Sequence, residues 1–250
     1  MEGYDASTYG DLIADVYDRW HPRGEGTETI AALLAELAGG AGGGRALELA
    51  IGTGRIALPL AERGVEVHGI DASEAMVAEL RTKPGGGRIP VALGDFADVA
   101  VEGRFRLVYV VFNTFFALLT QAEQVRCFRN VAERLTDDGV FVIEAFVPDP
   151  KRFERQQSVN TNRVTVDEVL LDVSRHDPVA QRIDSQHMLM RAEGIRLLPV
   201  SLRYAWPSEL DLMAQLAGLR LRERWAGWRR EPFTAASGAH VSVYGRPGSP

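Results

Sequence analysis

The sequence of 250 residues holds a single cysteine, Cys127, and lacks any apolar run of the roughly 20 residues that a membrane span needs. One thiol cannot form an internal disulfide bond, and chains without disulfides are typical of intracellular proteins, so we expect a cytoplasmic protein. The first 20 residues are rich in acids, whereas a secretory signal begins basic and continues apolar. We therefore expect neither an export signal nor a membrane partner.

Basic residues are too few to balance the acidic ones. The chain has 28 Lys and Arg against 34 Asp and Glu, for a net charge of -6. Because nucleic-acid binding needs a basic face to meet phosphates, this balance argues against an RNA or DNA partner. The His, Cys and acidic residues do not fall at the spacings of metal ligands, so we expect no metal site. The remaining composition, 46% hydrophobic and 25% charged, is that of an ordinary globular domain.

Alternating strands and helices dominate the sequence from residue 45 onward. Strands are predicted over 45–50, 65–70, 90–94, 105–112 and 140–146, and helices over 55–63, 73–83 and 120–135. Helices at 7–20 and 29–38 come before this pattern, and a helix at 208–217 with strands at 219–225 and 240–244 comes after it. We expect Asp138-Gly139 to form a turn, and Ser208 with Asp211 to form a capping box. The alternation predicts a doubly wound, seven-stranded α/β sheet.

The rhythm breaks after Pro148. Three segments, 162–174, 181–192 and 195–205, are rich in β-branched residues, lack a helical period and are separated by turn residues. They predict a three-stranded antiparallel β-meander inserted into the α/β domain. The chain then divides into an N-terminal helical cap (1–38), an α/β domain that binds the cofactor (39–149 and 206–250) and a meander (150–205) that serves as a lid over the acceptor.

A glycine turn stands between the first predicted strand and the helix that follows it. Gly52-x-Gly54-x-x-Ala57 formally matches the fingerprint of dinucleotide-binding proteins, and Asp71 follows at a plausible distance. The same arrangement of strand, turn, helix, strand and acid also holds S-adenosylmethionine, which has no phosphate. The turn does not decide between the two cofactors.

Two further carboxylates separate these cofactors. Glu48 ends the first strand, where its charge would repel a pyrophosphate and suit the cationic methionine end of S-adenosylmethionine. Asp95 follows the third strand, where it can accept a hydrogen bond from an adenine amino group, with the Phe96 ring beside it. Asp71 has two oxygens that match a ribose diol. Three acids at successive strand ends therefore favour S-adenosylmethionine.

These motifs resemble those of class I S-adenosylmethionine-dependent methyltransferases. The similar segments are Glu48–Gly54, Gly69–Asp71, Gly94–Phe96, the aromatic helix with Tyr9 and Tyr17-Asp18, and Asn113–Phe116. Within the family, the meander and the tail at 231–237 most resemble natural-product N-methyltransferases that act on aminosugars or on a peptide N-terminus. Ala50 stands where the family has its first glycine, and we expect its methyl group to be tolerated if φ there is negative.

The resemblance implies a set of contact residues. Those expected to bind S-adenosylmethionine are Tyr9, Tyr17, Glu48, Ala50, Gly52, Gly54, Asp71, Ala72, Met76, Asp95, Phe96 and Phe112. Three polar side chains are candidates for the acceptor side, namely Asn113, Glu144 and His187. Glu144 could accept a proton from an ammonium substrate, and His187 could act as a catalytic histidine. Each of the three also fits a purely structural role.

The expected activity is methyl transfer to a small-molecule or peptide acceptor, above all an amine of natural-product metabolism, by a monomer or homodimer. A sulfonium donor is already activated, so the protein must chiefly align donor and acceptor, and such positioning can be worth about 7–11 kcal/mol of barrier. Three alternatives stay open. They are an O-methyltransferase on a small hydroxylated metabolite, a dinucleotide-dependent oxidoreductase, and a binding module without catalysis.

Overall fold

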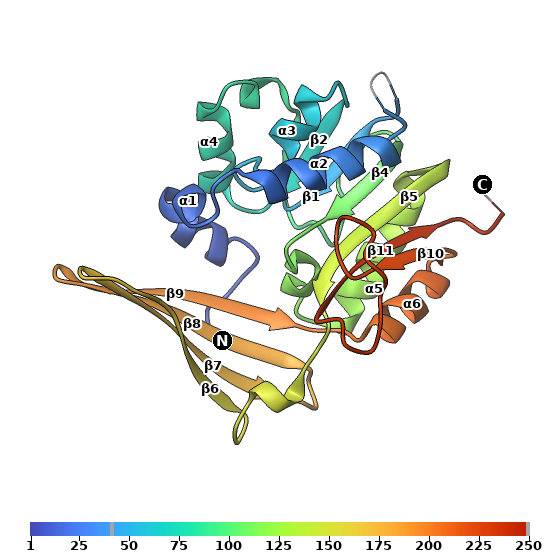
Figure 1. Ribbon diagram of the computed structural model, residues 1–250. Helices are drawn as coiled ribbons and strands as arrows, with labels where there is room; N and C mark the ends of the chain where they lie inside the picture. Colours follow the sequence, from blue (N-terminus) through green and yellow to red (C-terminus); the bar gives the residue numbers. More distant parts are fainter. Residues whose placement is uncertain (41–42, 249–250) are drawn as a thin grey trace.

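The computed structural model describes residues 1–40 and 43–248, and its main layer is a seven-stranded sheet (Figure 1). The strand order is β10-β11-β5-β4-β1-β2-β3. The strands are β1 (Ala46–Leu49), β2 (Val67–Asp71), β3 (Val91–Leu93), β4 (Phe105–Val110), β5 (Leu135–Phe146), β10 (Arg220–Trp225) and β11 (Ala239–Gly245). The first five run parallel, and β11 lies antiparallel between β5 and β10. The predicted doubly wound sheet is confirmed.

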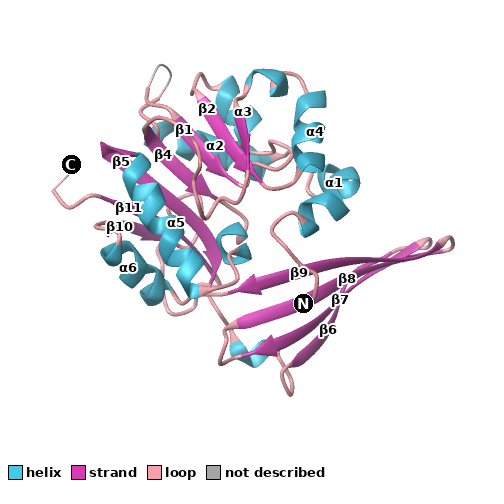
Figure 2. Ribbon diagram, turned by 180° about the vertical axis from the view of Figure 1, so that it is seen from behind, coloured by secondary structure: helices cyan, strands magenta, loops and turns pink. Residues whose placement is uncertain are grey.

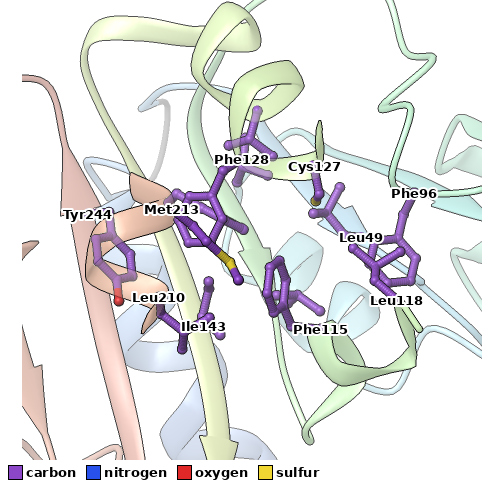
Figure 3. Packing of buried hydrophobic residues seen from close by; sticks show 14 of the residues in the cluster. Leu49, Phe96, Phe115, Leu118, Cys127, Phe128, Ile143, Leu210, Met213 and Tyr244 are labelled. Atoms are coloured by element: carbon purple, nitrogen blue, oxygen red, sulfur yellow. The ribbon is translucent and has the colours of Figure 1, made fainter. Parts of the chain in front are cut away.

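Helices cover both faces of this sheet (Figure 2). They are α2 (Glu25–Leu37), α3 (Ala57–Glu62), α4 (Glu74–Thr82), α5 (Gln121–Arg134) and α6 (Pro207–Leu216), with short 3₁₀ turns at Gly86–Arg88 and Thr114–Ala117. The first three contribute to one buried apolar cluster, and α5 and α6 contribute to another. Figure 3 shows Phe128, Met213 and Tyr244 packed together in the second cluster. Two apolar layers on opposite faces explain why the central strands are rich in apolar residues.

Two local predictions in this domain are wrong. Asp138-Gly139 is not a turn, because β5 begins at Leu135 and a shift of register against β4 takes up the additional residues. Nor does a capping box open α6. Its N-cap is Trp206, with Pro207 at the first helical position, and Asp211 instead pairs with Arg224 at 2.6 Å. The described capping box lies at the start of α5.

The insertion folds into a separate antiparallel sheet in the order β6-β7-β8-β9. Its strands are β6 (Gln157–Val164), β7 (Glu168–Asp177), β8 (Arg182–Arg191) and β9 (Gly194–Arg203). The meander is confirmed, but the expected three strands are four, since the segment predicted at 162–174 crosses the β6–β7 hairpin. β6 escaped prediction because it is a mostly exposed edge strand of polar residues, without a buried face to give an apolar alternation.

Helix α1 (Thr8–Trp20) lies between the two sheets and contacts both α4 and β9 (Figures 1 and 2). On the side of the insertion, Asp15 pairs with Arg196 of β9 at 2.8 Å. The N-terminal amine lies 3.7 Å from Asp184 of β8. No helix in the described ranges is long and apolar enough to cross a bilayer. Cap and insertion are thus joined at the edge of the large sheet.

Candidate functional site

The carboxyl ends of β1, β2 and β4 meet at one edge of the large sheet. The strand order reverses here, because β2 and β3 follow on one side of β1 while β4 and β5 lie on the other. Open α/β sheets bind their ligands in the crevice at such a switch point. The glycine turn at 50–54, Asp71 and the chain at 111–113 therefore line one crevice.

The glycine turn is wound in the left-handed region. Ala50, Gly52 and Gly54 have φ of 55°, 55° and 76°. The expectation of a negative φ at Ala50 is therefore wrong, and an alanine in this conformation costs about 1–2 kcal/mol. A Cβ on Gly52 would meet only the Met76 sulfur, at 3.9 Å, whereas one on Gly54 would come within 2.3 Å of a Leu80 methyl carbon. Gly52 leaves the turn open to a ligand, and Gly54 lets it pack on α4.

Asp71 ties this turn to the end of β2. Its Oδ2 accepts the Gly52 N–H at 2.7 Å, and its Oδ1 accepts the Ser73 N–H at 2.9 Å. The residue is 7% exposed, and burial raises the pKa of its carboxyl. Each carboxylate oxygen can accept a further hydrogen bond. Asp71 thus shapes the turn and keeps acceptor capacity at its edge.

Glu48 lies beneath the turn and not in the open crevice. It is 3% exposed, and its Oε2 accepts the Tyr109 hydroxyl hydrogen at 3.0 Å. Burial raises the pKa of this carboxyl to about 8. The contact of Glu48 with a cationic ligand, direct or through water, stays a prediction. The buried carboxyl joins two strands, since Glu48 and Tyr109 are register partners of β1 and β4.

Two acids of α1 fasten that helix over the crevice. Asp18 accepts the Thr53 hydroxyl hydrogen at 2.7 Å and pairs with Lys83 at 2.5 Å. Asp11 accepts the Ser73 hydroxyl hydrogen at 2.6 Å. The helix thereby carries the half-buried rings of Tyr9 and Tyr17 to the cofactor side, and both rings pack on the small cluster that includes Met76. These ties were not predicted, because each joins residues far apart in the sequence.

Arg55, Tyr17 and Phe112 form a cationic and aromatic cluster across the crevice. The Arg55 guanidinium carbon lies 3.3 Å from the centre of the Phe112 ring and 6.0 Å from that of Tyr17. Such contacts stabilise a cation over a ring face. Among residues 1–40 and 43–248, no group forms a hydrogen bond with the buried Nε and Nη2 atoms of Arg55. Sequence reasoning gave Arg55 no role, although a cation directly after the glycine turn was a usable signal.

The corner after β4 brings two of the predicted catalytic residues together. Glu144 accepts the Phe112 N–H on Oε2 at 2.9 Å and the Trp228 indole N–H on Oε1 at 2.8 Å. The Asn113 side-chain oxygen accepts the Phe146 N–H at 2.7 Å. Both polar side chains therefore lie at the crevice, and their oxygens are engaged in holding the chain.

The insertion meets helix α1 beside this corner. His187 lies on β8 opposite Asp172 of β7, with 3.9 Å between the Nδ1 and Oδ1 atoms. Burial lowers the pKa of His21, at the end of α1, and the nearby Arg55 and His187 lower it further. The His21 ring also contacts that of Tyr17, with centroids 4.8 Å apart. Helix α1 thus contacts both the glycine turn and strand β9 of the meander.

The other cofactor candidates lie at the ends of β2 and β3. Asp95 accepts the Ala97 N–H at 2.8 Å, and Ala72 directly follows Asp71. Phe96, expected to offer a ring face, is 8% exposed and packs in the core beside Leu118 (Figure 3). Within residues 1–40 and 43–248, we find no group of three or more His, Cys, Asp or Glu residues that could hold a metal ion.

Comparison with known proteins identifies the family. Residues 46–139 match the family model described as a methyltransferase domain. The cypemycin N-terminal methyltransferase of a Streptomyces species is 29% identical over 195 residues, which cover 76% of this chain and 78% of that protein. The SAM-bound structure of CalS10, an amino pentose methyltransferase from Micromonospora echinaspora, has the same fold, with a TM-score of 0.67, 22% identity and coverage of 92% of this chain and 96% of that one.

A further similar structure covers almost the whole length of both chains. It is that of the CcbJ methyltransferase from Streptomyces caelestis, which is 43% identical, has a TM-score of 0.90 and covers 97% of this chain and 99% of that one. The switch-point crevice and its glycine turn lie where open α/β sheets bind their ligands. The chain therefore belongs to the class I S-adenosylmethionine-dependent methyltransferases.

Proposed function

We propose that the protein transfers a methyl group from S-adenosylmethionine to an amine nitrogen of a small natural product or peptide. The main support is the hydrogen bonding of Glu144, whose two carboxylate oxygens accept hydrogen bonds from the Phe112 N–H and the Trp228 indole N–H. The carboxyl at the acceptor side thus serves to hold the chain, whereas a hydroxyl acceptor needs a base to ionise it. A neutral amine brings its own lone pair. Two similar proteins, named for a peptide N-terminus and for an amino pentose, also act on substrates that carry amines.

The residues around the glycine turn fit the cofactor. Asp71 can meet the ribose diol, the open face at Gly52 allows a close approach, and the two unpartnered nitrogens of Arg55 suit the methionine carboxylate. When bound, the cofactor supplies an activated methyl group. The work left to the protein is to orient both substrates and exclude water, and the rings of Tyr17 and Phe112 form walls for this purpose.

The insertion supplies the acceptor side. We assign residues 1–38 to a cap, 39–149 and 206–250 to the part that binds the cofactor, and 150–205 to an acceptor lid. The assignment is supported by the contacts of β9 with α1, the helix that is tied to the glycine turn, while the proposed cofactor contacts come from outside the insertion. His187 of β8 can hydrogen-bond the acceptor and so position it beside the methyl donor.

A binding and turnover experiment tests this proposal. Calorimetry with S-adenosylhomocysteine and with NAD compares the two cofactors, and we expect binding of the first only. A panel of primary amines, secondary amines and matched alcohols, read by mass spectrometry, then identifies the acceptor class. Methylation of amines but not of the matched alcohols supports the proposal. Methylation of alcohols only, or binding without any turnover, contradicts it.

A further inference from the structure

We propose that Glu144 and Trp228 are positioning residues that hold the Phe112-Asn113 corner in a strained shape, and that Glu144 is not the base of the reaction. The proposal rests on methyl transfer at the crevice described above. It assigns a role to Trp228, a residue of the loop between β10 and β11, which no motif marks.

The corner has an unusual backbone. Phe112 and Asn113 have φ of 56° and 64°, two successive left-handed residues that carry side chains. Bulky residues such as phenylalanine rarely adopt this conformation. Strained backbone of this kind persists only where its surroundings impose it, and it gathers at functional sites.

Three hydrogen bonds from β5 impose the shape. The Phe112 N–H donates to the Glu144 carboxylate at 2.9 Å, and the Asn113 N–H donates to the Glu144 backbone carbonyl at 3.2 Å. In return, the Asn113 side-chain oxygen accepts the Phe146 N–H at 2.7 Å. One side chain of β5 and one of the corner therefore lock the two segments together.

Trp228 holds the Glu144 carboxylate in the position from which it accepts the Phe112 N–H. Its indole N–H donates to Glu144 Oε1 at 2.8 Å, and its ring packs against the apolar cluster under α2 and α3. Glu144 consequently accepts two hydrogen bonds from groups that are themselves held. Protonation would weaken both of these charge-assisted bonds, so acting as the base would loosen the corner at the moment of transfer.

The corner in turn places a ring at the reaction site. Phe112 is 37% exposed, and its ring lies against the Arg55 guanidinium beside the glycine turn. Glu144 therefore governs the distance between the β4 side and the β1 side of the crevice. A displacement of about 1 Å in such a wall can lower a rate by about 100-fold.

The test compares Glu144→Gln and Trp228→Phe with Trp206→Phe as a matched control, since Trp206 is 40% exposed at the start of α6. Hydrogen exchange of the Phe112 amide is measured in the cofactor-free protein. We expect the Phe112 amide to exchange about tenfold faster in Glu144→Gln and in Trp228→Phe, and at the wild-type rate in Trp206→Phe. We also expect kcat to fall about tenfold or more, with an unchanged pH profile.

Two results would overturn the proposal. One is Trp228→Phe with wild-type exchange and wild-type kcat. The other is loss of the low-pH limb of the kcat profile in Glu144→Gln while Trp228→Phe keeps full activity, since this would identify a base. If Glu144→Gln does not fold, Trp228→Phe decides. The exchange measurement needs no acceptor, so failure of the amine proposal is seen separately, and kcat is then measured on whichever alcohol the panel reveals.

Discussion

Replacing Glu48 by glutamine should remove a large part of the pH dependence of stability. The carboxyl is buried, and its pKa is raised from 4.5 to about 8. The folded protein therefore keeps a proton that the unfolded chain loses between pH 4.5 and 8. Stability from this group is fully present below pH 4.5 and is lost as the pH rises to 8. This difference in pKa corresponds to at most about 5 kcal/mol of the free energy of unfolding.

Glutamine has the same shape, carries no charge and can still accept the Tyr109 hydroxyl hydrogen. Urea unfolding of the wild type and of Glu48→Gln at pH 5 and pH 8 measures the effect. We expect similar stabilities at pH 5 and a variant more stable by several kcal/mol at pH 8. Glu102→Gln, on an exposed loop, is the control and should follow the wild type. A Glu48→Gln variant that loses stability with pH as steeply as the wild type would refute the reasoning.

Three other predictions concern the crevice. Asp71→Ala should weaken S-adenosylhomocysteine binding about 10- to 100-fold, since it loses hydrogen bonds to a charged group, and calorimetry showing wild-type affinity would contradict its role. Gly52→Val should abolish that binding in a folded protein, whereas Gly54→Val should lower the melting temperature by clashing with α4. Gly24→Val is the control and should do neither, since Gly24 has an extended backbone and open space around it. His187→Gln should change acceptor kcat or KM and spare cofactor affinity, so equal losses in both would make the insertion a structural element only.

Much of the α/β domain could be predicted because its signals are local. From Leu107 onward, the central strand β4 is a continuous apolar run, as expected of a strand covered on both faces. Asp71 could be placed at the crevice because it follows directly after a strand of a parallel sheet, and all such ends lie at one edge. The helix layers on both faces and the position of the glycine turn follow from the same alternation.

The burial of individual side chains and the sign of the backbone angle φ could not be predicted from the sequence. Glu48 was correctly placed at the end of the strand, but its side chain is buried under the glycine turn. Burial there raises the pKa of its carboxyl. Ala50 has a positive φ, and an alanine in the sequence gives no signal of that conformation. The contact of Trp228 with Glu144 joins residues 84 positions apart, and no local pattern marks such a pair. β6 carries the polar sequence of an exposed edge, so its pairing with β7 gives no periodic signal.

Helix α1 is bound on two sides at once, and this restricts how the protein can open. Asp11 and Asp18 fasten it to the cofactor edge, while Asp15 fastens it to Arg196 of the insertion. A rigid rod anchored to two bodies cannot leave one without pulling on the other. Uncovering the glycine turn and displacing the insertion are therefore a single motion.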